Sequence, residues 1–323
     1  MARRDVEHTE LPYPNGWFAV AYSRDLIEGG VQAIHYFGED MVLFRTRSGQ
    51  ARVLDAFCPH LGAHIGEGGR VMGETVRCPF HGWQYDGESG NCTHIPYCER
   101  IPSQAQVRPW HTQEKNGMIF VWYHAEGKAP DWDFPLIEEI GHADWSEPRA
   151  VSRELPAHVQ DTHENNSDSV HFQFVHGMTD TPPSETLHDT DGTLRVVSHC
   201  EEQLPGGETA PYDMVRDSWG LGLMSLRMEG FAGVGLLMFS STTPIEKERV
   251  ITRWLLTVTK NMADVAGEDF MKNMVDGVND DMRVWEHKVH RARPVLCEAD
   301  DHLSEYRKWA RRFYSEPVGD EAS

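Results

Sequence analysis

Two short segments, Cys58-Pro-His60 and Cys78-Pro-Phe-His81, decide the organisation of this chain. Seventeen residues separate them, so the pattern reads Cys-x-His followed by Cys-x-x-His. Each segment can supply one sulfur and one imidazole nitrogen from a short loop. The proline after each cysteine fixes the backbone angle φ and stiffens that loop. The pattern predicts one site with two sulfur and two nitrogen ligands.

Two thiolates and two imidazoles are the ligand set of a Rieske [2Fe–2S] centre, in which two His replace two Cys on one iron. A structural zinc site also accepts two Cys and two His. Zinc sites usually pair Cys with Cys and His with His, whereas each segment here carries one of each. We therefore expect an iron–sulfur cluster. Zinc, or chance among six cysteines and 18 histidines, is the alternative.

The composition bounds the class of protein. The chain has 323 residues, of which 39% are hydrophobic, enough for one large domain or two ordinary ones. The longest apolar run, residues 230–239, is short and broken by glycine, so no membrane helix is expected. The net charge of −21 argues against nucleic acid and anionic membranes as partners. Six cysteines, two of them in the metal motif, favour a reducing compartment, and we expect a cytoplasmic protein.

The first part of the sequence reads as strands. Aromatic and β-branched runs predict them at residues 16–22, 33–37, 41–45, 51–55, 70–77 and 117–123. Each metal-binding segment would then directly follow the end of a strand. The Pro-, Gly- and charge-containing stretch 125–135 reads as a connection. We therefore expect an all-β domain over residues 12–125 and a second domain over residues 126–316.

The second domain mixes helices with strands. Pro156 suits the first turn of a helix and Gly177 its end, so residues 156–177 are expected to be helical. Strands are expected at residues 194–199, 222–228, 234–243 and 249–259, and further helices at 264–289 and 300–314. Strands between long helices indicate an α+β domain with helices on an antiparallel sheet.

A polar constellation lies in the centre of the helix expected at residues 156–177. Asn165, Asp168, His171 and His176 stand among Phe and Val residues that favour burial, and buried Asp and His need partners or a metal. On an ideal helix the two histidines lie about 140° apart, so holding one ion would require a distortion such as a π-type bulge. A solvated face with two scattered histidines is the alternative.

One carboxylate would complete, with these histidines, the 2-His-1-carboxylate site of a non-haem Fe(II) oxygenase. The helix expected at residues 264–289 offers Asp276, Asp280 and Asp281. Asp281 falls within the apolar stripe of that helix, whereas Asp276 and Asp280 fall on the opposite face. Gly277, one turn earlier, leaves room above Asp281. We therefore expect Asp281 to be the third ligand; the alternative is a slightly longer polar face.

Together the motifs resemble the oxygenase component of a Rieske non-haem iron oxygenase, over nearly the whole chain. The resemblance rests on Cys58-x-His60, Cys78-x-x-His81 and Asn165-x-x-Asp168-x-x-His171-x-x-x-x-His176. Residues 158–176, Asp281-x-x-x-Trp285 and the closing segment 306–314 are similar to the 3-ketosteroid 9α-hydroxylase branch, which includes the cholesterol 7-desaturases. Gly82-Trp-Gln-Tyr85 is closer to Rieske oxygenases in general, and the chain is short for that branch.

The resemblance implies a role for each motif residue. The cluster would have two thiolates on one iron and two imidazoles on the other, from Cys58, Cys78, His60 and His81. A mononuclear Fe(II) would be held by His171, His176 and Asp281. In such proteins the cluster of one subunit serves the iron of its neighbour in a ring of three. Asp168 would then bridge His81 of one chain and His171 of the next, with Asn165 near the iron, in a helix-grip catalytic domain.

The resemblance also implies a reaction, namely monooxygenation by O2 of a bulky apolar substrate of polycyclic, steroid-like type, as in steroid or lipid catabolism. No Gly-rich dinucleotide fingerprint stands in a strand–helix context, so electrons would come from a separate NAD(P)H-linked reductase or ferredoxin. Apolar runs at residues 221–226 and 231–239 favour an apolar pocket. The alternatives are an aromatic-ring dihydroxylating dioxygenase, an O- or N-demethylase, and a non-catalytic Rieske electron carrier.

Overall fold

The computed structural model describes residues 11–188, 192–203, 207–230 and 234–315. The chain divides into two compact units. The small unit comprises residues 17–123 and 127–131, and the large unit comprises the described residues of 1–16, 124–126 and 132–323. Two sequence expectations fall partly outside the described residues: the apolar run 231–239, of which residues 231–233 are not described, and residue 316, the expected end of the second domain.

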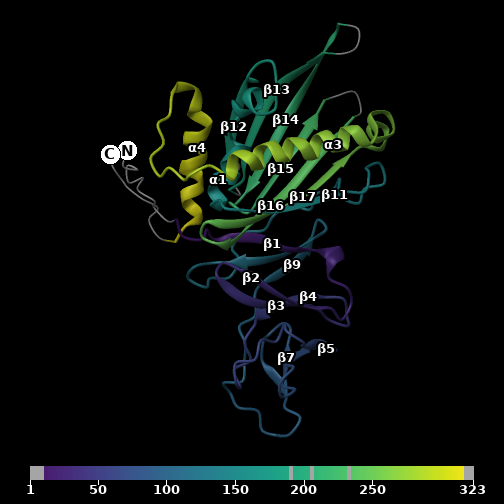
Figure 1. Cartoon of the computed structure of the whole chain (residues 1–323), viewed down its shortest axis with the longest axis vertical. Coiled ribbons are helices and arrows are strands. Elements are labelled where there is room, and N and C mark those ends of the chain that lie inside the picture. The colour runs from purple at the N-terminus through teal and green to yellow at the C-terminus, as the bar shows by residue number, and fades with distance from the viewer. Residues whose placement is uncertain (1–10, 189–191, 204–206, 231–233, 316–323) are drawn as a thin grey trace. The chain divides into compact units, whose positions relative to one another are not determined.

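Three sheets build the small unit (Figure 1). Their strand orders are β1-β10-β9, β2-β3-β4 and β5-β6-β7-β8. The strands and one 3-10 turn span Gly16–Tyr22 (β1), Ser23–Asp25 (η1), Val31–Tyr36 (β2), Glu39–Arg45 (β3), Ala51–Asp55 (β4), Arg70–Met72 (β5), Thr75–Arg77 (β6), Gln84–Asp86 (β7), Cys92–His94 (β8), Thr112–Lys115 (β9) and Met118–Tyr123 (β10). Five of the six strands expected here are confirmed to within two residues.

The single strand expected at residues 70–77 is wrong. These residues form a hairpin in which Arg70 pairs with Arg77. Gly73 turns the chain with a φ of +68°, a conformation that glycine adopts without strain. Strands β7, β8 and β9 were not expected, because three or four residues are too few to show an alternating pattern. The hairpin has a consequence for the site, since β6 ends directly at Cys78.

A seven-stranded antiparallel sheet forms the centre of the large unit (Figure 1), in the order β11-β17-β16-β15-β14-β13-β12. Its strands span Arg149–Leu155 (β11), Ser184–His188 (β12), Leu194–Gln203 (β13), Thr209–Trp219 (β14), Leu223–Glu229 (β15), Leu236–Glu246 (β16) and Arg249–Val258 (β17). The four strands expected here are confirmed as β13, β15, β16 and β17, although β13 continues beyond the expected end. Strands β11, β12 and β14 were not expected, because their many polar residues leave no clear alternation of apolar and polar side chains.

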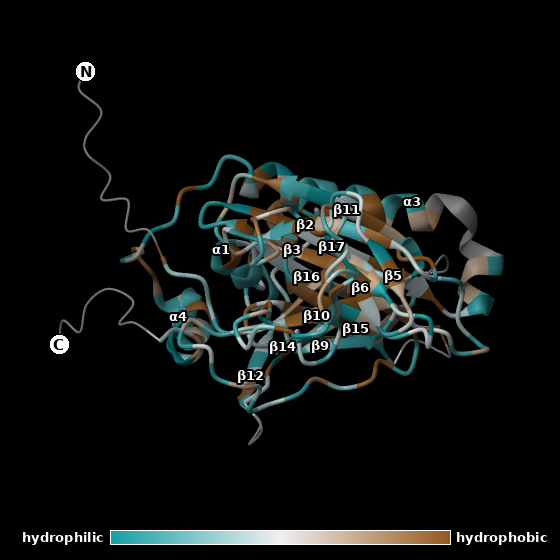
Figure 2. Cartoon of the chain, turned by 90° about the horizontal axis from the view of Figure 1, so that it is seen from below, coloured by the Kyte–Doolittle hydropathy of each residue, from teal (hydrophilic) through white to brown (hydrophobic). Residues whose placement is uncertain are grey.

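Helices accompany this sheet, as expected for an α+β domain. Figure 1 shows α3 (Lys260–Trp285) running across the sheet. The last helix, α4 (Asp301–Ala310), lies against β12 and has short 3-10 turns on either side, η3 (Glu298–Asp300) and η4 (Arg311–Phe313). In Figure 2 the hydrophobic colour gathers on strands such as β16, whereas much of α4 is hydrophilic. Among the helices in the described residues, none combines the length and apolar character needed to cross a bilayer.

The continuous helix expected at residues 156–177 is wrong. It is divided into α1 (Val159–His163), the 3-10 turn η2 (Glu164–Asn166) and α2 (His171–Phe174). The chain leaves the helix between η2 and α2 because the carboxylate of Asp168 binds the backbone amides of Val170 and His171, at 2.9 and 3.2 Å. Gly177 ends the segment with a φ of +72°. His176 therefore lies beyond the helix, and no π-type bulge is needed to turn it toward His171.

Candidate metal centres

The segments that carry Cys58 and Cys78 fold into two matching loops. In each loop the amide of the glycine four residues on donates to the cysteine carbonyl, at 2.9 Å for Gly62 and 3.2 Å for Gly82. Both glycines have a positive φ, +75° and +77°. A Cβ on Gly82 would also lie only 3.0 Å from Cγ of Pro96. Glycine at these positions lets each loop turn back and present its cysteine and histidine together.

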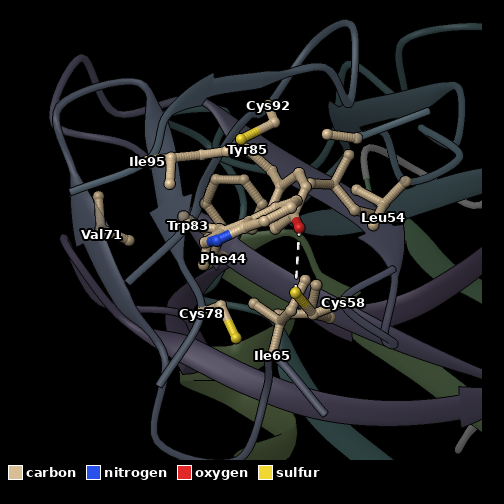
Figure 3. Close-up of a cluster of buried hydrophobic side chains, with 14 residues drawn as sticks. Phe44, Leu54, Cys58, Ile65, Val71, Cys78, Trp83, Tyr85, Cys92 and Ile95 are labelled. Carbon is tan, nitrogen blue, oxygen red and sulfur yellow. Dashed lines mark hydrogen bonds between the residues drawn. The ribbon is translucent and has the colours of Figure 1, made fainter. Parts of the chain in front are cut away.

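The predicted ligands of the two loops lie close to one another. Figure 3 shows the sulfurs of Cys58 and Cys78 at the same end of a cluster of buried side chains, with Cys92 at the other end. The ring centroids of His60 and His81 are 4.6 Å apart. Both loop cysteines are 2% exposed, and burial raises the pKa of Cys78. The structure therefore brings together the two thiols and the two imidazoles.

This donor set fits a metal cluster. Nδ1 of His60 is buried and finds no hydrogen-bond partner among the described residues, which is uncommon for a buried polar atom. Two adjacent buried thiols are costly to ionise alone, but metal coordination deprotonates thiols. The hydroxyl of Tyr85 lies 3.0 Å from Sγ of Cys58 (dashed in Figure 3). Burial raises the pKa of Tyr85, so the hydroxyl stays protonated and would donate to the sulfur once metal binding has deprotonated the thiol.

Three further predicted ligands meet in the large unit. His171 begins α2, His176 follows that helix, and Asp281 comes from α3. Oδ1 of Asp281 lies 3.2 Å from Nε2 of His176 and 3.9 Å from Nε2 of His171. The possible ligand atoms all lie within 4.8 Å of one another. Metal–ligand bonds of about 2.1 Å place neighbouring ligand atoms roughly 3 Å apart, so the three side chains fit around one ion.

The electrostatics of this group depend on Asp281. Burial lowers the pKa of His176, but the hydrogen bond and charge of Asp281 outweigh it, so the pKa is raised overall. Asp281 is itself buried, whereas Asp276 is exposed and Asp280 binds the guanidinium of Arg283 at 2.9 Å. A Cβ added to Gly277 would lie 3.9 Å from Nδ1 of His176, in ordinary contact. Of the three candidate aspartates, only Asp281 reaches the histidines.

Asp168 and Asn165 contact His171 from different sides. Nδ2 of Asn165 lies 3.1 Å from Nε2 of His171. Asp168 lies 3.9 Å from Nδ1 of the same ring, a buried atom with no hydrogen-bond partner among the described residues. Burial raises the pKa of Asp168, but His171 and the two backbone amides outweigh it and lower the pKa overall. Asp168 is therefore an ionised carboxylate beside the outer edge of the His171 ring.

A buried arginine, Arg216 on β14, was not anticipated from the sequence. Its guanidinium donates to the carbonyl of Asp168 at 2.9 Å and to the hydroxyl of Ser169 at 2.8 Å. It also lies 5.0 Å from the centre of the Phe172 ring. Burial lowers the pKa of Arg216 to about 10, so the group is still a cation at neutral pH. Arg216 thus holds the turn that positions His171. The sequence feature that could have indicated this is a charged residue on the same face of the strand as Met214 and Ser218.

Two other buried polar side chains of this segment, Asp161 and His163, have partners. Oδ1 of Asp161 lies 3.0 Å from Nδ1 of His290 and 3.7 Å from Nζ of Lys288. His163 lies 3.1 Å from the carbonyl of Leu223 through Nε2, and burial lowers its pKa to about 4, so it is neutral and donates. Burial of Asp161 and of Nε2 of His163 is therefore explained by pairing, whereas Nδ1 of His171 is buried with no hydrogen-bond partner among the described residues.

A cavity of about 260 Å³ opens beside the His171, His176 and Asp281 group. All three side chains line it, together with inward-facing residues of β14 to β17 and one face of α3. Most of the lining is apolar, with Leu226, Leu236 and Trp254 among the residues from the sheet. A bulky apolar molecule in this cavity would lie directly against the three candidate ligands.

Comparisons with known families cover most of the chain. Residues 16–105 match the Rieske [2Fe-2S] domain. Residues 121–314 match the 3-ketosteroid 9α-hydroxylase C-terminal domain. The first match contains both cysteine loops, and the second contains His171, His176 and Asp281.

Individual relatives agree with these matches. The chain is 32% identical to cholesterol 7-desaturase nvd of Xenopus laevis, over 98% of this chain and 75% of that protein. It is 28% identical to the 3-ketosteroid-9-alpha-monooxygenase oxygenase component of Mycobacterium tuberculosis, over 96% of this chain and 85% of that protein. Among solved structures, the NdmA QL mutant of Pseudomonas putida CBB5 with theobromine has a TM-score of 0.75 at 21% identity, covering 91% of this chain and 89% of that one. A dicamba monooxygenase has a TM-score of 0.75 at 17% identity, covering 93% and 97%.

Proposed function

Because the chain belongs to the family of Rieske oxygenases with a 3-ketosteroid 9α-hydroxylase C-terminal domain, we propose that it hydroxylates a bulky apolar, steroid-like substrate. As a member of that family it is an oxidoreductase that uses a [2Fe–2S] cluster, a mononuclear Fe(II) and O2, with electrons from a reductase or ferredoxin. The observation that carries the substrate proposal is the largely apolar cavity beside the His171, His176 and Asp281 group. None of the six cysteines forms a disulfide, which supports action in the reducing cytoplasm.

In this proposal residues 12–125 form the cluster domain and residues 126–316 the catalytic domain. The cluster is bound by the four side chains of the matching loops, Cys58, His60, Cys78 and His81. His171, His176 and Asp281 hold the mononuclear iron, which when bound supplies the activation of O2 next to the substrate. Asn165, which lies 3.1 Å from Nε2 of His171, would turn aside and stay next to the ion.

The chain's own groups would then do three things. The His171, His176 and Asp281 side chains, which line the cavity, would hold the ion next to the bound substrate. The apolar walls exclude water and hold the substrate by shape. Asp168 accepts a hydrogen bond from the outer nitrogen of His171, once the 3.9 Å gap closes, and thereby fixes the tautomer in which Nε2 is the ligand.

We further propose that the working form is a homotrimer in which the cluster of one chain serves the iron of the next. Support comes from two exposed apolar side chains beside the cluster histidines, Leu61 (66% exposed) and Phe80 (61% exposed). Large apolar side chains next to a redox site suit a surface that is covered in an assembly. Asp168, whose side chain is 29% exposed, would face His81 of the neighbour.

The test of the proposed function is turnover with a surrogate NAD(P)H-linked reductase. A panel of ketosteroids, bile-acid-like compounds, polycyclic aromatics and N- or O-methyl compounds would be incubated with the loaded enzyme and O2. We expect a ketosteroid to gain one hydroxyl, seen as the mass of one oxygen atom. Vicinal diols from the aromatics, or loss of methyl groups, would replace the substrate assignment, and no oxidised product at all would contradict the proposal.

The hydrogen bond from Tyr85 to Cys58 gives a prediction for the cluster itself. Hydrogen bonds to cluster sulfurs raise the reduction potential, because they stabilise the more negative reduced state. The variant Tyr85→Phe should therefore lower the potential by roughly 20–60 mV, the equivalent of one ordinary hydrogen bond in a one-electron couple. A redox titration followed by electron paramagnetic resonance measures this. Tyr97→Phe is the matched control, because the Tyr97 hydroxyl binds Trp83 at 2.7 Å; equal shifts in both variants would contradict the assignment.

A further inference from the structure

The cavity beside the candidate iron site is unusually rich in methionine. Of the 13 methionines in the chain, the cavity lining includes six: Met178, Met214, Met224, Met228, Met238 and Met274. Strands β14, β15 and β16 and helix α3 contribute five of them. A thioether is a flexible, apolar wall that adapts to a ligand, but it is also the apolar side chain most readily oxidised. In an oxygenase, this lining would place oxidisable thioether sulfurs beside the site at which O2 is activated.

Met178 is the member of this group that lies nearest to a candidate ligand along the chain. Only Gly177 separates it from His176, so the two Cα atoms are at most about 7 Å apart. It packs against the buried cluster formed by Phe172, Cys200 and Met214, and the centroid of the Phe172 ring is 5.7 Å from that of His176. Met178 and His176 also line both the cavity and an adjoining surface groove. Met178 is therefore a half-buried thioether at the place where the iron site meets the groove.

We propose that Met178 is a site of self-oxidation when the enzyme turns over without a well-fitting substrate; this rests on the proposed function. The thioether sulfur gains one oxygen atom from O2 and becomes a sulfoxide. The O–O bond breaks, and the second oxygen leaves as water with two protons. The reductase supplies two electrons, so the reaction has the balance of a hydroxylation but with sulfur as the acceptor. A bound substrate prevents this reaction by occupying the cavity.

Such an oxidation would change the cavity. The sulfoxide replaces a flexible apolar side chain with a polar, chiral one. Met178 lines the cavity and packs against the cluster that contains Phe172, which lies beside His171. The change would therefore weaken the binding of an apolar molecule beside the iron ligands. Methionine sulfoxide reductases reverse the reaction. Oxidation of Met178 would therefore be a reversible modification that marks enzyme molecules which have turned over without substrate.

Peptide mass spectrometry can test this with an internal control. Trypsin releases residues 154–195, in which Met178 is the single methionine, and residues 71–77, in which Met72 is the single methionine. Met72 is 44% exposed and belongs to the small unit. The holoenzyme would be incubated with surrogate reductase, NAD(P)H and O2, with catalase present and no substrate. We expect the 154–195 peptide to gain one oxygen atom several-fold more often than the 71–77 peptide.

Further control samples distinguish oxidation of Met178 at the iron site from oxidation by peroxide in solution. Substrate should suppress the gain, and the iron-depleted protein should show none. Equal gain in both peptides would indicate peroxide in solution and would overturn the inference, as would a gain in the 154–195 peptide of Met178→Leu. If the holoenzyme holds the mononuclear iron and oxidises a substrate while Met178 stays unmodified, this inference alone fails. If no mononuclear iron is bound, the proposed function fails with it.

Discussion

Replacing Asp281 with alanine is expected to remove the mononuclear iron and abolish turnover while leaving the cluster in place. Among the described residues, Asp281 has the only carboxylate that lies within 4 Å of both His171 and His176, at 3.9 and 3.2 Å. Two imidazoles alone offer no charge to offset that of a divalent ion in a largely apolar cavity. Iron per chain should fall from about three atoms to about two. Metal analysis and the visible spectrum of the cluster measure the two sites separately.

Asp280→Ala is the matched control for this experiment. Asp280 precedes Asp281 on the same helix, is partly exposed, and binds Arg283 instead of the histidines. The same substitution there should keep about three irons and normal turnover. Full iron and activity in Asp281→Ala would exclude Asp281 as a ligand. Loss of the cluster spectrum in Asp281→Ala would indicate a folding defect, which the control would reveal if it were general to α3.

The cluster site was within reach of sequence analysis because its geometry is local. Each loop contains its own cysteine, histidine and turn-forming glycine within a few residues, as at Cys58 and Gly62. The position of Asp281 was also accessible, because helical periodicity distinguishes a buried carboxylate from the exposed Asp276. In both cases the information lies within one short stretch and needs no knowledge of the rest of the fold.

The shape of the segment around His171 was not accessible in this way. Its helix is broken by Asp168 and by Arg216, which lies 48 residues further on and binds the Asp168 carbonyl. The periodicity of residues 156–177 contains no information about a hydrogen-bond donor on β14, so a continuous helix was expected. The cavity depends on the same kind of information, since its walls come from four strands and α3. The role of Tyr85 likewise depends on the folded contact with Cys58.

The second large effect is expected from Asp168→Asn, which should keep both metals but reduce turnover by roughly 10- to 100-fold. Asparagine retains an oxygen that can accept from the amides of Val170 and His171, so the turn before α2 is preserved. It loses the negative charge beside the outer nitrogen of His171, 3.9 Å away. If Asp168 connects a neighbour's cluster to the iron, the loss should fall on electron transfer. Oxidation of the prereduced cluster by O2 in a single turnover would measure that step.

Asp40→Asn provides the control, because Asp40 forms an exposed pair with His35 at 2.7 Å and lies in the small unit. It changes the same charge in an aspartate–histidine pair that contains no proposed ligand. Normal single-turnover oxidation in Asp168→Asn would show that the carboxylate charge is not needed for electron transfer. Asp168 would then serve only to bind the two backbone amides, and another group would have to connect the subunits. Slow oxidation together with lost iron would instead assign Asp168 to holding His171. Only slow oxidation with all iron retained supports a carboxylate that links the two redox sites, because that outcome separates electron delivery from metal binding.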